Sequence, residues 1–354
     1  MMDYTKVQFI GLRFYTGRKP MQNKFKGEYT GFKSCYQDIQ GRCDILKETI
    51  KRASTSQNID HNPRTLKVFM APEFFFRNKD GAYPIEAVHN IMELMRTYTT
   101  SNPHYRDWLF IMGTAIGHLE HVDGNEIFNI ALIQKGGTKS AEQPDSLIVY
   151  KEYISHVDYL RDKTAYPAFS DPKNRVGLIG DVTSNEKRLF PTEGSSDILS
   201  KYSNPTGSGL ERSKSGLGGQ GIFTIGGITF GLEVCLDHAY ERLRQSPWLP
   251  TENKIQVQLV CSAGMSITES SLACCHKGLI FNVDGNVADA RLNRNTGSFM
   301  HPKLEHSSYP NPLSQETNLA VPMLPQSFVQ KYSAIPSLAI KVFDSIDVPQ
   351  NTVV

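Results

Sequence analysis

The sequence predicts an α/β fold. Apolar runs of strand length alternate with segments of helical period, two-residue turn signals join neighbouring runs, and 39% apolar content in 354 residues allows a large buried core. Hairpins interleaved with helices are expected to form a sheet whose outer face is covered by helices. No change of composition divides the chain, so we expect one domain over residues 1–354.

The first elements predict a β-α-β unit. Residues 7–14 are an apolar run of strand length, and residues 37–53 repeat apolar side chains along one helical face. Residues 66–76 then form an apolar strand that runs into Glu73 and three aromatic residues. Residues 85–98 return to the helical period and follow a proline, which suits the first turn of a helix.

Strands dominate the rest of the chain. Six further apolar runs are predicted strands: 108–117, 126–134, 147–153, 222–225, 228–234 and 255–262. Asp123-Gly124 joins the first two as a hairpin. Gly226-Gly227 joins 222–225 to 228–234 in a two-residue turn of the kind that needs positive φ.

Three chemically active residues each stand at the end of an apolar strand: Glu73, Lys151 and Cys235. The strand before Cys235 changes abruptly into polar, helix-compatible sequence at 237–244. A thiol at such an elbow is held rigidly yet faces substrate, and a following helix N-terminus favours the thiolate. Burial of Glu73 between Pro72 and the aromatic residues would raise its pKa towards the range of a general base.

Each of these residues also has a structural interpretation. Most lone cysteines are small buried apolar residues, Glu73 fits a strand-end salt bridge, and Lys151 fits a solvated strand-end charge. Their coincidence at the ends of three strands favours a functional site.

The ordered trio Pro72-Glu73, Tyr150-Lys151 and Cys235-Leu236-Asp237 resembles the nitrilase, or carbon-nitrogen hydrolase, superfamily. Segments 261–263 and 281–287 are similar as well, so the resemblance spans roughly residues 5–290. It implies a four-layer αββα sandwich, a Glu-Lys-Cys triad and a thioester intermediate. Family members also use a C-terminal arm in dimer contacts.

The chain departs from the family pattern near the site. Only Asp237, and loosely Glu241, matches the residues that usually follow the nucleophile, and Tyr153 replaces a common histidine, the nearest one being His156. A second active-site glutamate, usual in the amidase branches, has three candidates: Glu186, Glu193 and Glu211. These departures affect the expected substrate more than the expected reaction.

We therefore expect a hydrolase of a non-peptide C–N bond, of amide or carbamoyl type, acting on a small molecule. Glu73 is the expected base, Cys235 the nucleophile, and Lys151 with the backbone N–H of Leu236 the oxyanion donors. Leu236-Asp237 is closer to the amidase and carbamoylase pattern than to the Trp-Glu of nitrilases.

Asp237 and His238 are candidate supporting residues, with Asp237 expected to cap the helix or pair with a base. Two other classes stay open. One is a thiol hydrolase or transferase that pairs Cys235 with His238 or His276, and the other is a catalytically degenerate binding protein of the same fold.

Two segments stand apart from this pattern. Residues 162–220 are rich in Ser, Gly, Asn, Pro and Lys, which is typical of a substrate-covering or interface insertion or of disorder. Residues 216–221 fit GxGxxG, but a strand follows instead of a helix, so we reject dinucleotide binding. A C-terminal arm begins at about 301, and its apolar run 337–343 is expected either in a dimer contact or as an added edge strand.

Composition limits the remaining classes. The net charge is +2, only 21% of residues are charged, and no basic block occurs, so we expect no nucleic-acid partner. Neither a signal peptide nor a membrane-spanning run is apparent, and we expect a cytoplasmic homodimer or higher homo-oligomer, with secretion by a route without a cleaved signal left open. The six cysteines are sparse and expected to be reduced. The spacing of Cys274-Cys275-His276 disfavours zinc, and no cofactor is expected.

Overall fold

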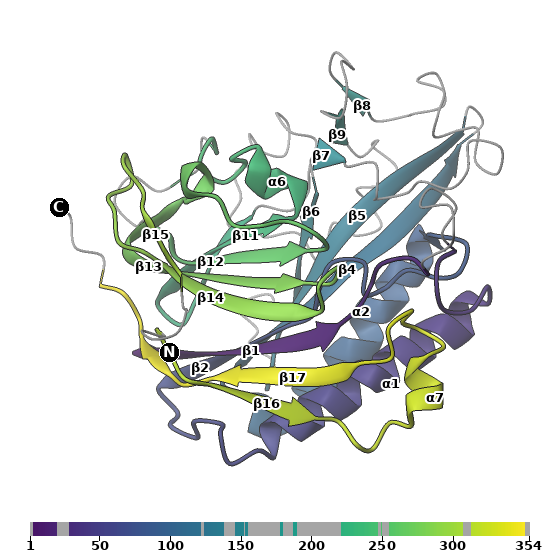
Figure 1. Cartoon of the computed structure of the whole chain (residues 1–354). Coiled ribbons are helices and arrows are strands. Elements are labelled where there is room, and N and C mark those ends of the chain that lie inside the picture. Colours follow the sequence, from purple (N-terminus) through teal and green to yellow (C-terminus); the bar gives the residue numbers. More distant parts are fainter. Residues whose placement is uncertain are drawn as a thin grey trace.

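Two stacked β-sheets form the centre of the computed structural model, and helices α1 and α2 cover the outer side of one of them (Figure 1). The structure describes residues 3–19, 28–121, 124–137, 146–151, 153–154, 178–179, 187–189, 221–246, 249, 255–306 and 313–350. The α/β sandwich expected from the sequence is confirmed in these residues.

The first sheet has the order β16-β17-β1-β2-β4-β5-β6, and its central strands β1, β2 and β4 run parallel. The strands are β1 (Lys6–Phe14), β2 (Thr65–Met70), β4 (Trp108–His121), β5 (Gly124–Lys135), β6 (Ser146–Tyr150), β16 (Glu316–Ala320) and β17 (Leu338–Phe343). Two short strands extend it: β3 (Tyr83–Pro84) pairs with β4, and β18 (Ile346–Asp347) pairs with β1.

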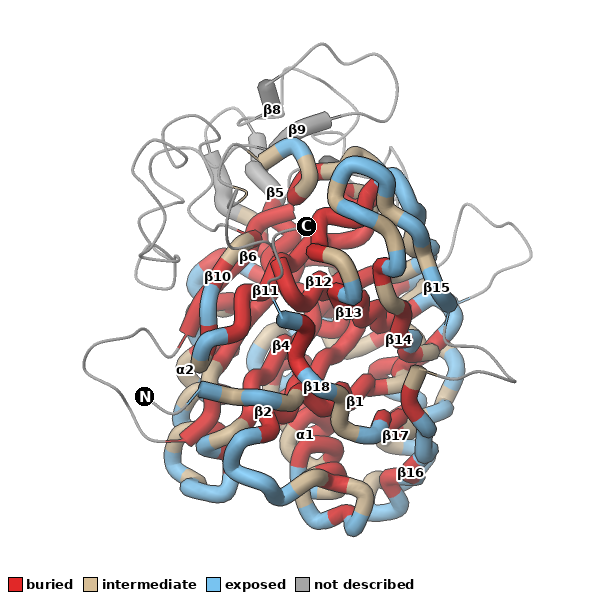
Figure 2. The backbone as a smooth tube through the Cα atoms, turned by 90° about the vertical axis from the view of Figure 1, so that its left-hand side faces the viewer, coloured by how far each residue is buried: buried red, intermediate tan, exposed pale blue. Residues whose placement is uncertain are grey.

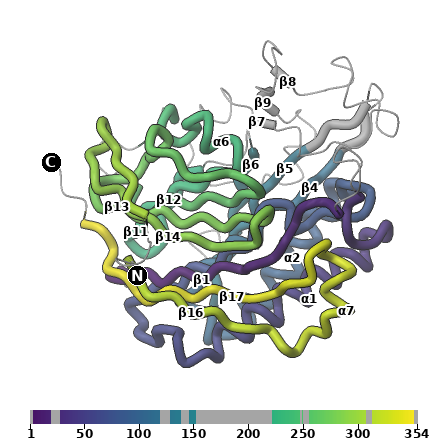
Figure 3. Tube along the Cα trace, in the orientation of Figure 1, coloured from purple at the N-terminus to yellow at the C-terminus, as the bar shows by residue number. Residues whose placement is uncertain are grey.

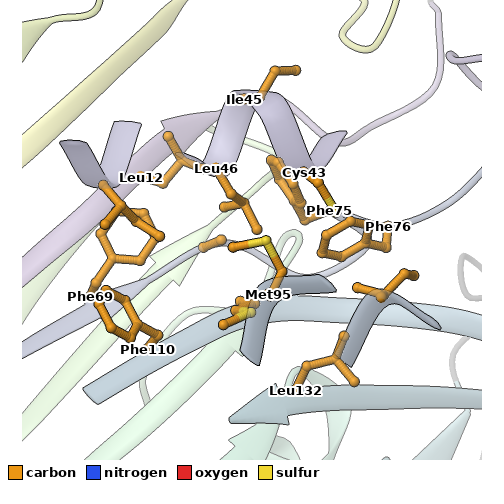
Figure 4. Close-up of a cluster of buried hydrophobic side chains, with 14 of the residues drawn as sticks. Leu12, Cys43, Ile45, Leu46, Phe69, Phe75, Phe76, Met95, Phe110 and Leu132 are labelled. Atoms are coloured by element: carbon orange, nitrogen blue, oxygen red, sulfur yellow. The ribbon is translucent and has the colours of Figure 1, made fainter. Parts of the chain in front are cut away.

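Helices α1 (Cys35–Ser54) and α2 (Ile85–Thr100) pack on this sheet, close to the predicted ranges. Ser34 caps α1, because its side chain accepts a hydrogen bond from the Gln37 N–H. The apolar faces of α1 and α2 pack against the sheet in one cluster (Figure 4). Its labelled members are Leu12, Cys43, Ile45, Leu46, Phe69, Phe75, Phe76, Met95, Phe110 and Leu132. This burial holds the helix layer in place.

The second sheet has the order β10-β11-β12-β13-β14-β15. Its strands are β10 (Ile222–Ile225), β11 (Ile228–Val234), β12 (Ile255–Ser262), β13 (Cys274–Asp284), β14 (Asp289–Asn295) and β15 (Leu304–His306). Gly226 and Gly227 both have positive φ, 52° and 81°, as the predicted turn between β10 and β11 requires. Strands β11, β12 and β13 run parallel, so their carboxyl ends meet at one edge.

The inner faces of the two sheets form a second core. Phe9 of β1 and Phe281 of β13 pack against each other in a tilted arrangement, with ring centroids 4.8 Å apart. Gly11 permits this close approach, because a Cβ atom there would lie 2.2 Å from the Cβ of Ala290 on β14. Buried residues follow the strands, and exposed residues follow the connecting loops (Figure 2).

The layer over the outer face of the second sheet is thin in the described residues. It consists of the one-turn helix α6 (Leu236–Ala239), the turns up to residue 246, and the 3-10 helix η4 (Glu269–Ser271). A helix does follow Cys235, but it covers only the start of the helix-compatible segment 237–244: α6 ends at Ala239, and Glu241 adopts a positive φ of 57° that an α-helix cannot contain.

The C-terminal apolar run is part of the same subunit. β17 lies between β16 and β1, with Val342 opposite Ile10 of β1. β1 and β17 are neighbours although they come from opposite ends of the chain (Figure 3). It is therefore an inner strand, and β16 forms the edge. A short helix, α7 (Gln326–Val329), lies between β16 and β17 in the sequence.

Most of the predicted insertion at 162–220 lies outside the described residues. Its described parts, β8 (Leu178–Ile179) and β9 (Lys187–Leu189), form a small sheet with β7 (Tyr153–Ile154) in the order β7-β9-β8. Among the described residues, none of the helices has the length and apolar character that crossing a bilayer requires.

Candidate active site

Glu73 lies on the segment that leaves β2 and turns back towards the second sheet. Its side chain is fully buried, and its backbone N–H donates to the carbonyl of Ser262, at the end of β12, over 3.3 Å. The next residue, Phe74, has a φ of 62° and donates its N–H to Thr114 Oγ1 over 2.9 Å. The glutamate therefore stands on a strained segment that β4 and β12 hold from both sides.

Lys151 directly follows β6 and contacts Glu73. Its Nζ donates to Glu73 Oε1 over 2.9 Å, and both side chains are fully buried. Lys151 also donates its backbone N–H to the carbonyl of Asn129 on β5 over 2.8 Å. Buried charges are stable only when paired and hydrogen-bonded, so this ion pair balances two otherwise costly groups.

Asn129 is a site residue that the sequence analysis missed. Its Nδ2 donates to the same oxygen, Glu73 Oε1, over 2.9 Å, and its side chain is 2% exposed. A signal was present, because Asn129 is the one polar residue in the run 127–133, which is otherwise apolar. Nothing in the sequence places that side chain opposite Glu73.

Cys235 occupies a sharp elbow between β11 and α6. Its φ of 50° and ψ of −107° lie in a region that few non-glycine residues adopt. Its backbone N–H donates to the carbonyl of Cys261 over 3.0 Å, and its carbonyl accepts the N–H of His238 over 2.9 Å. Cys235 is 5% exposed, and it is the N-cap residue of α6.

The end of β12 connects Cys235 to Glu73. Cys261 accepts the Cys235 N–H through its carbonyl, and its Sγ donates to the carbonyl of Ala71, two residues before Glu73, over 3.3 Å. Burial raises the pKa of the Cys261 thiol, and the negative charges of Glu73 and Cys235 raise it further, while Lys151 lowers it. Glu73, Lys151 and Cys235 are therefore each close enough to Cys261 to affect the pKa of its thiol.

Helix α1 supports the glutamate segment from behind. The buried Arg42 donates to the carbonyls of Phe75 and Arg77, each over 2.7 Å, and to Asp38 Oδ2 over 2.6 Å. The hydroxyl of Tyr83 donates to the same Asp38 oxygen. The guanidinium of Arg42 thus fixes two carbonyls of the segment that carries Glu73.

The other predicted site residues have varied positions. Leu236 is the first residue of α6, where a backbone N–H has no acceptor within its own helix. Asp237 is buried in the first turn, but the N-cap position belongs to Cys235, so the predicted capping role of Asp237 is wrong, while its alternative role of pairing with a base stays a prediction. The three candidates for a second glutamate, Glu186, Glu193 and Glu211, and the histidine His156 lie outside the described residues.

Neither histidine considered as a partner for Cys235 is placed for that role. His238 Nε2 accepts the N–H of Thr268 over 3.2 Å, so the ring proton is assigned to Nδ1, which donates to Glu233 Oε2 over 2.8 Å. His276 is near the start of β13, and its Nδ1 contacts the carbonyl of Gly297 over 3.2 Å, whereas Cys261, which binds the Cys235 N–H, pairs with Val283 near the other end of β13.

The described residues contain no group of three or more His, Cys, Asp or Glu side chains that could hold a metal ion. The adjacent Cys274 and Cys275 are buried in β13. The backbone carbonyl of each accepts a hydrogen bond from Asn295 Nδ2.

Comparisons with known proteins gave matches only among solved structures; no protein-family model and no curated protein matches the chain. A cysteine-to-alanine mutant of the amidase from Nesterenkonia sp. AN1, in complex with butyramide, superposes with a TM-score of 0.40 and 12% identity, over 98% of this chain and 92% of that chain. Nit3 of Saccharomyces cerevisiae, a member of branch 10 of the nitrilase superfamily, gives a TM-score of 0.40 and 9% identity over 97% and 92%.

The chain is similar to solved members of the nitrilase superfamily. TM-scores of this size carry no assignment of activity or substrate, which must come from the contacts within the chain itself.

Proposed function

We propose that this chain is a divergent nitrilase-superfamily hydrolase that cleaves a non-peptide C–N bond, of amide or carbamoyl type, with Cys235 as its nucleophile. The observation that carries the proposal is the fully buried contact of 2.9 Å between Lys151 Nζ and Glu73 Oε1, at the ends of separate strands. Cys235, on a strained elbow, is linked to the same segment through Cys261 and Ser262.

The first half of the reaction forms a thioester. Glu73 accepts the thiol proton of Cys235, and the thiolate adds to the carbonyl carbon of the substrate. The oxyanion that appears in the tetrahedral intermediate is stabilised by the Lys151 ammonium and the Leu236 N–H. The C–N bond then breaks, Glu73 returns its proton to the nitrogen, and ammonia or an amine leaves.

The second half regenerates the enzyme. Glu73 takes a proton from water, and the resulting hydroxide attacks the thioester carbon. The same two donors stabilise the second oxyanion, the C–S bond breaks, and the Cys235 sulfur recovers a proton from Glu73. The buried Lys151 and Asn129 hold the Glu73 carboxylate in one orientation through both halves.

The hydrogen bonds of His238 support this assignment over a Cys-His pair. Both ring nitrogens are engaged, one with Glu233 and the other with the backbone of Thr268. A base that is already a donor on one side and an acceptor on the other cannot take the thiol proton without losing a bond.

The test is turnover of a panel of small amides and N-carbamoyl compounds by the wild type and by three variants. Cys235→Ala is expected to abolish turnover and to leave the midpoint temperature of thermal unfolding almost unchanged. Lys151→Ala is expected to reduce kcat on the order of 100- to 1,000-fold, the usual cost of losing an oxyanion donor. Cys274→Ala serves as the matched control and retains turnover, because Cys274 is also a buried cysteine but lies at the start of β13, away from Glu73 and Cys235.

Two results would contradict the proposal. Turnover that survives in Cys235→Ala excludes the thiol as nucleophile. Full activity of Glu73→Gln, together with loss in a His238 variant, would favour the Cys-His class instead.

A further inference from the structure

The residues that flank Cys235 are joined across the elbow by a buried polar network. Glu233 lies two residues before the cysteine on β11, and His238 lies three residues after it in α6. His238 Nδ1 donates to Glu233 Oε2 over 2.8 Å, and both side chains are fully buried. This bond therefore connects the last part of the strand with the first turn of the helix.

Further contacts fix both partners to the neighbouring elements. Gln258 of β12, also fully buried, donates to Glu233 Oε2 over 2.9 Å and to the carbonyl of Ser271 over 3.0 Å. Glu233 Oε1 accepts the N–H of Leu243 over 2.8 Å. The carboxylate thus accepts three hydrogen bonds, which offsets the cost of burying it.

We propose that Glu233, His238 and Gln258 are positioning residues that hold Cys235 in its strained, substrate-facing conformation. A non-glycine residue at φ 50° and ψ −107° has a strained backbone, which persists only where its surroundings impose it. The two backbone bonds of Cys235 go to Cys261 and His238, and the network fixes His238 by both of its ring nitrogens. Without the network the elbow relaxes and the sulfur moves from its reactive position.

This inference rests on the proposed function for its kinetic consequence, but the position of the sulfur can be measured without it. The direct readout is the second-order rate of Cys235 alkylation by iodoacetamide, followed by mass spectrometry of the Cys235 peptide. The second readout is kcat and KM for whichever amide the wild type hydrolyses.

His238→Phe keeps an aromatic ring of similar size but removes both hydrogen bonds. We expect it to lower both Cys235 alkylation and kcat by about 10- to 100-fold, the range for a reacting group displaced by about 1 Å, with KM within about threefold of the wild type. His238→Asn, whose amide can still donate to Glu233, is expected to recover most of both rates.

The matched control is Gln256→Leu. Gln256 is a buried glutamine on β12, like Gln258, but it lies near the start of that strand and away from Cys235. Its side chain accepts the N–H of Thr229 and donates to the carbonyl of Pro349. This variant is expected to lower the midpoint temperature of thermal unfolding without changing the rate of Cys235 alkylation or kcat.

Folded His238→Phe with wild-type alkylation and kcat would overturn the inference, and so would an equal loss in Gln256→Leu. If His238→Phe does not fold, Glu233→Gln decides, because it keeps the side-chain volume and replaces one carboxylate oxygen; wild-type alkylation in that variant overturns the inference too. Should the wild type hydrolyse no amide, the proposed function fails, while slower alkylation in the variants still supports the positioning role.

Discussion

Two residues of the candidate site have backbone conformations that non-glycine residues rarely adopt. Five non-glycine residues in the described part of the chain have positive φ, and two of them are Cys235 and Phe74, the neighbour of Glu73. Such strain costs of order 1–3 kcal/mol and is concentrated at functional sites. The proposed nucleophile and the residue next to the proposed base thus both have a strained backbone.

Asn129 gives a prediction at the level of a single hydrogen bond. Asn129→Leu removes the Nδ2 donor to Glu73 Oε1 while keeping a similar volume. A hydrogen bond to a charged group contributes about 1.5–3 kcal/mol, so kcat/KM is expected to fall by about 10- to 100-fold in steady-state kinetics on the preferred amide.

Asn295→Leu is the control for that substitution. Asn295 is equally buried, on β14, and donates to the carbonyl of Cys274 over 3.0 Å, away from Glu73. It is expected to lower stability but leave kcat/KM unchanged, and an equal loss of kcat/KM in both variants would remove Asn129 from the site.

The three principal candidates could be predicted from the sequence because each directly follows, or closely follows, an apolar strand. Glu73 and Lys151 are chemically conspicuous at such positions, and their contact in the structure is a consequence of where the strands end. Asn129 could not be predicted in the same way, since a polar residue within a strand usually marks a solvent-facing position. The pairing of β5 with β4, in which Asn129 lies opposite Ile116, brings it to Glu73.

Among the elements, α1 does more than cover the sheet. Its one buried i,i+4 ion pair, Asp38 with Arg42, also binds the carbonyls of Phe75 and Arg77, and so joins the helix to the segment of Glu73. The helix itself was predictable from its apolar period, but this connection was not, because both residues read as ordinary polar positions in the sequence.

Arg42→Met tests this connection. It leaves Asp38 buried without its guanidinium, so the free energy of unfolding, measured by urea denaturation, is expected to fall by about 3–5 kcal/mol. Lys47→Met is the control on the same helix: Lys47 lies 3.8 Å from Asp44 with both side chains partly exposed, and its loss is expected to cost less than about 1 kcal/mol.

The double variant Asp38→Leu/Arg42→Met separates stability from positioning. Removing both charges is expected to recover part of the stability, because no buried charge is left alone. Hydrolysis is still expected to be impaired, since Phe75 and Arg77 lose their donor. Wild-type kcat in a folded double variant would show that α1 does not position the glutamate segment.

At the scale of the whole molecule, the site depends on the stacking of the two sheets. Glu73 and Lys151 follow strands of the first sheet and Cys235 follows a strand of the second, and contacts such as Phe9 with Phe281 and Gly11 against Ala290 set the distance between the sheets. The α/β class follows from alternating strand and helix patterns in the sequence. The stacking itself came only from the family resemblance, because periodicity identifies a buried face without saying what covers it.

The place of β17 shows the same limit. An apolar run near the C-terminus predicts a strand, but both the dimer-arm and edge-strand interpretations assumed that it has one neighbour or none in its own sheet. In the structure β17 has β16 on one side and β1 on the other. Long-range pairing of this kind depends on the closure of the whole chain, which local sequence does not encode.

The central claim, that Cys235 carries an acyl group during turnover, has one direct measurement. Wild-type protein is acid-quenched during turnover of a small-amide panel, and its intact mass and Cys235 peptide are determined, with Cys235→Ala and Cys261→Ala treated in parallel. We predict a mass increase equal to the acyl group, located on Cys235, absent from Cys235→Ala and present in Cys261→Ala. Hydrolysis of the amide with the acyl group on another residue, or with turnover undiminished in Cys235→Ala, would contradict it.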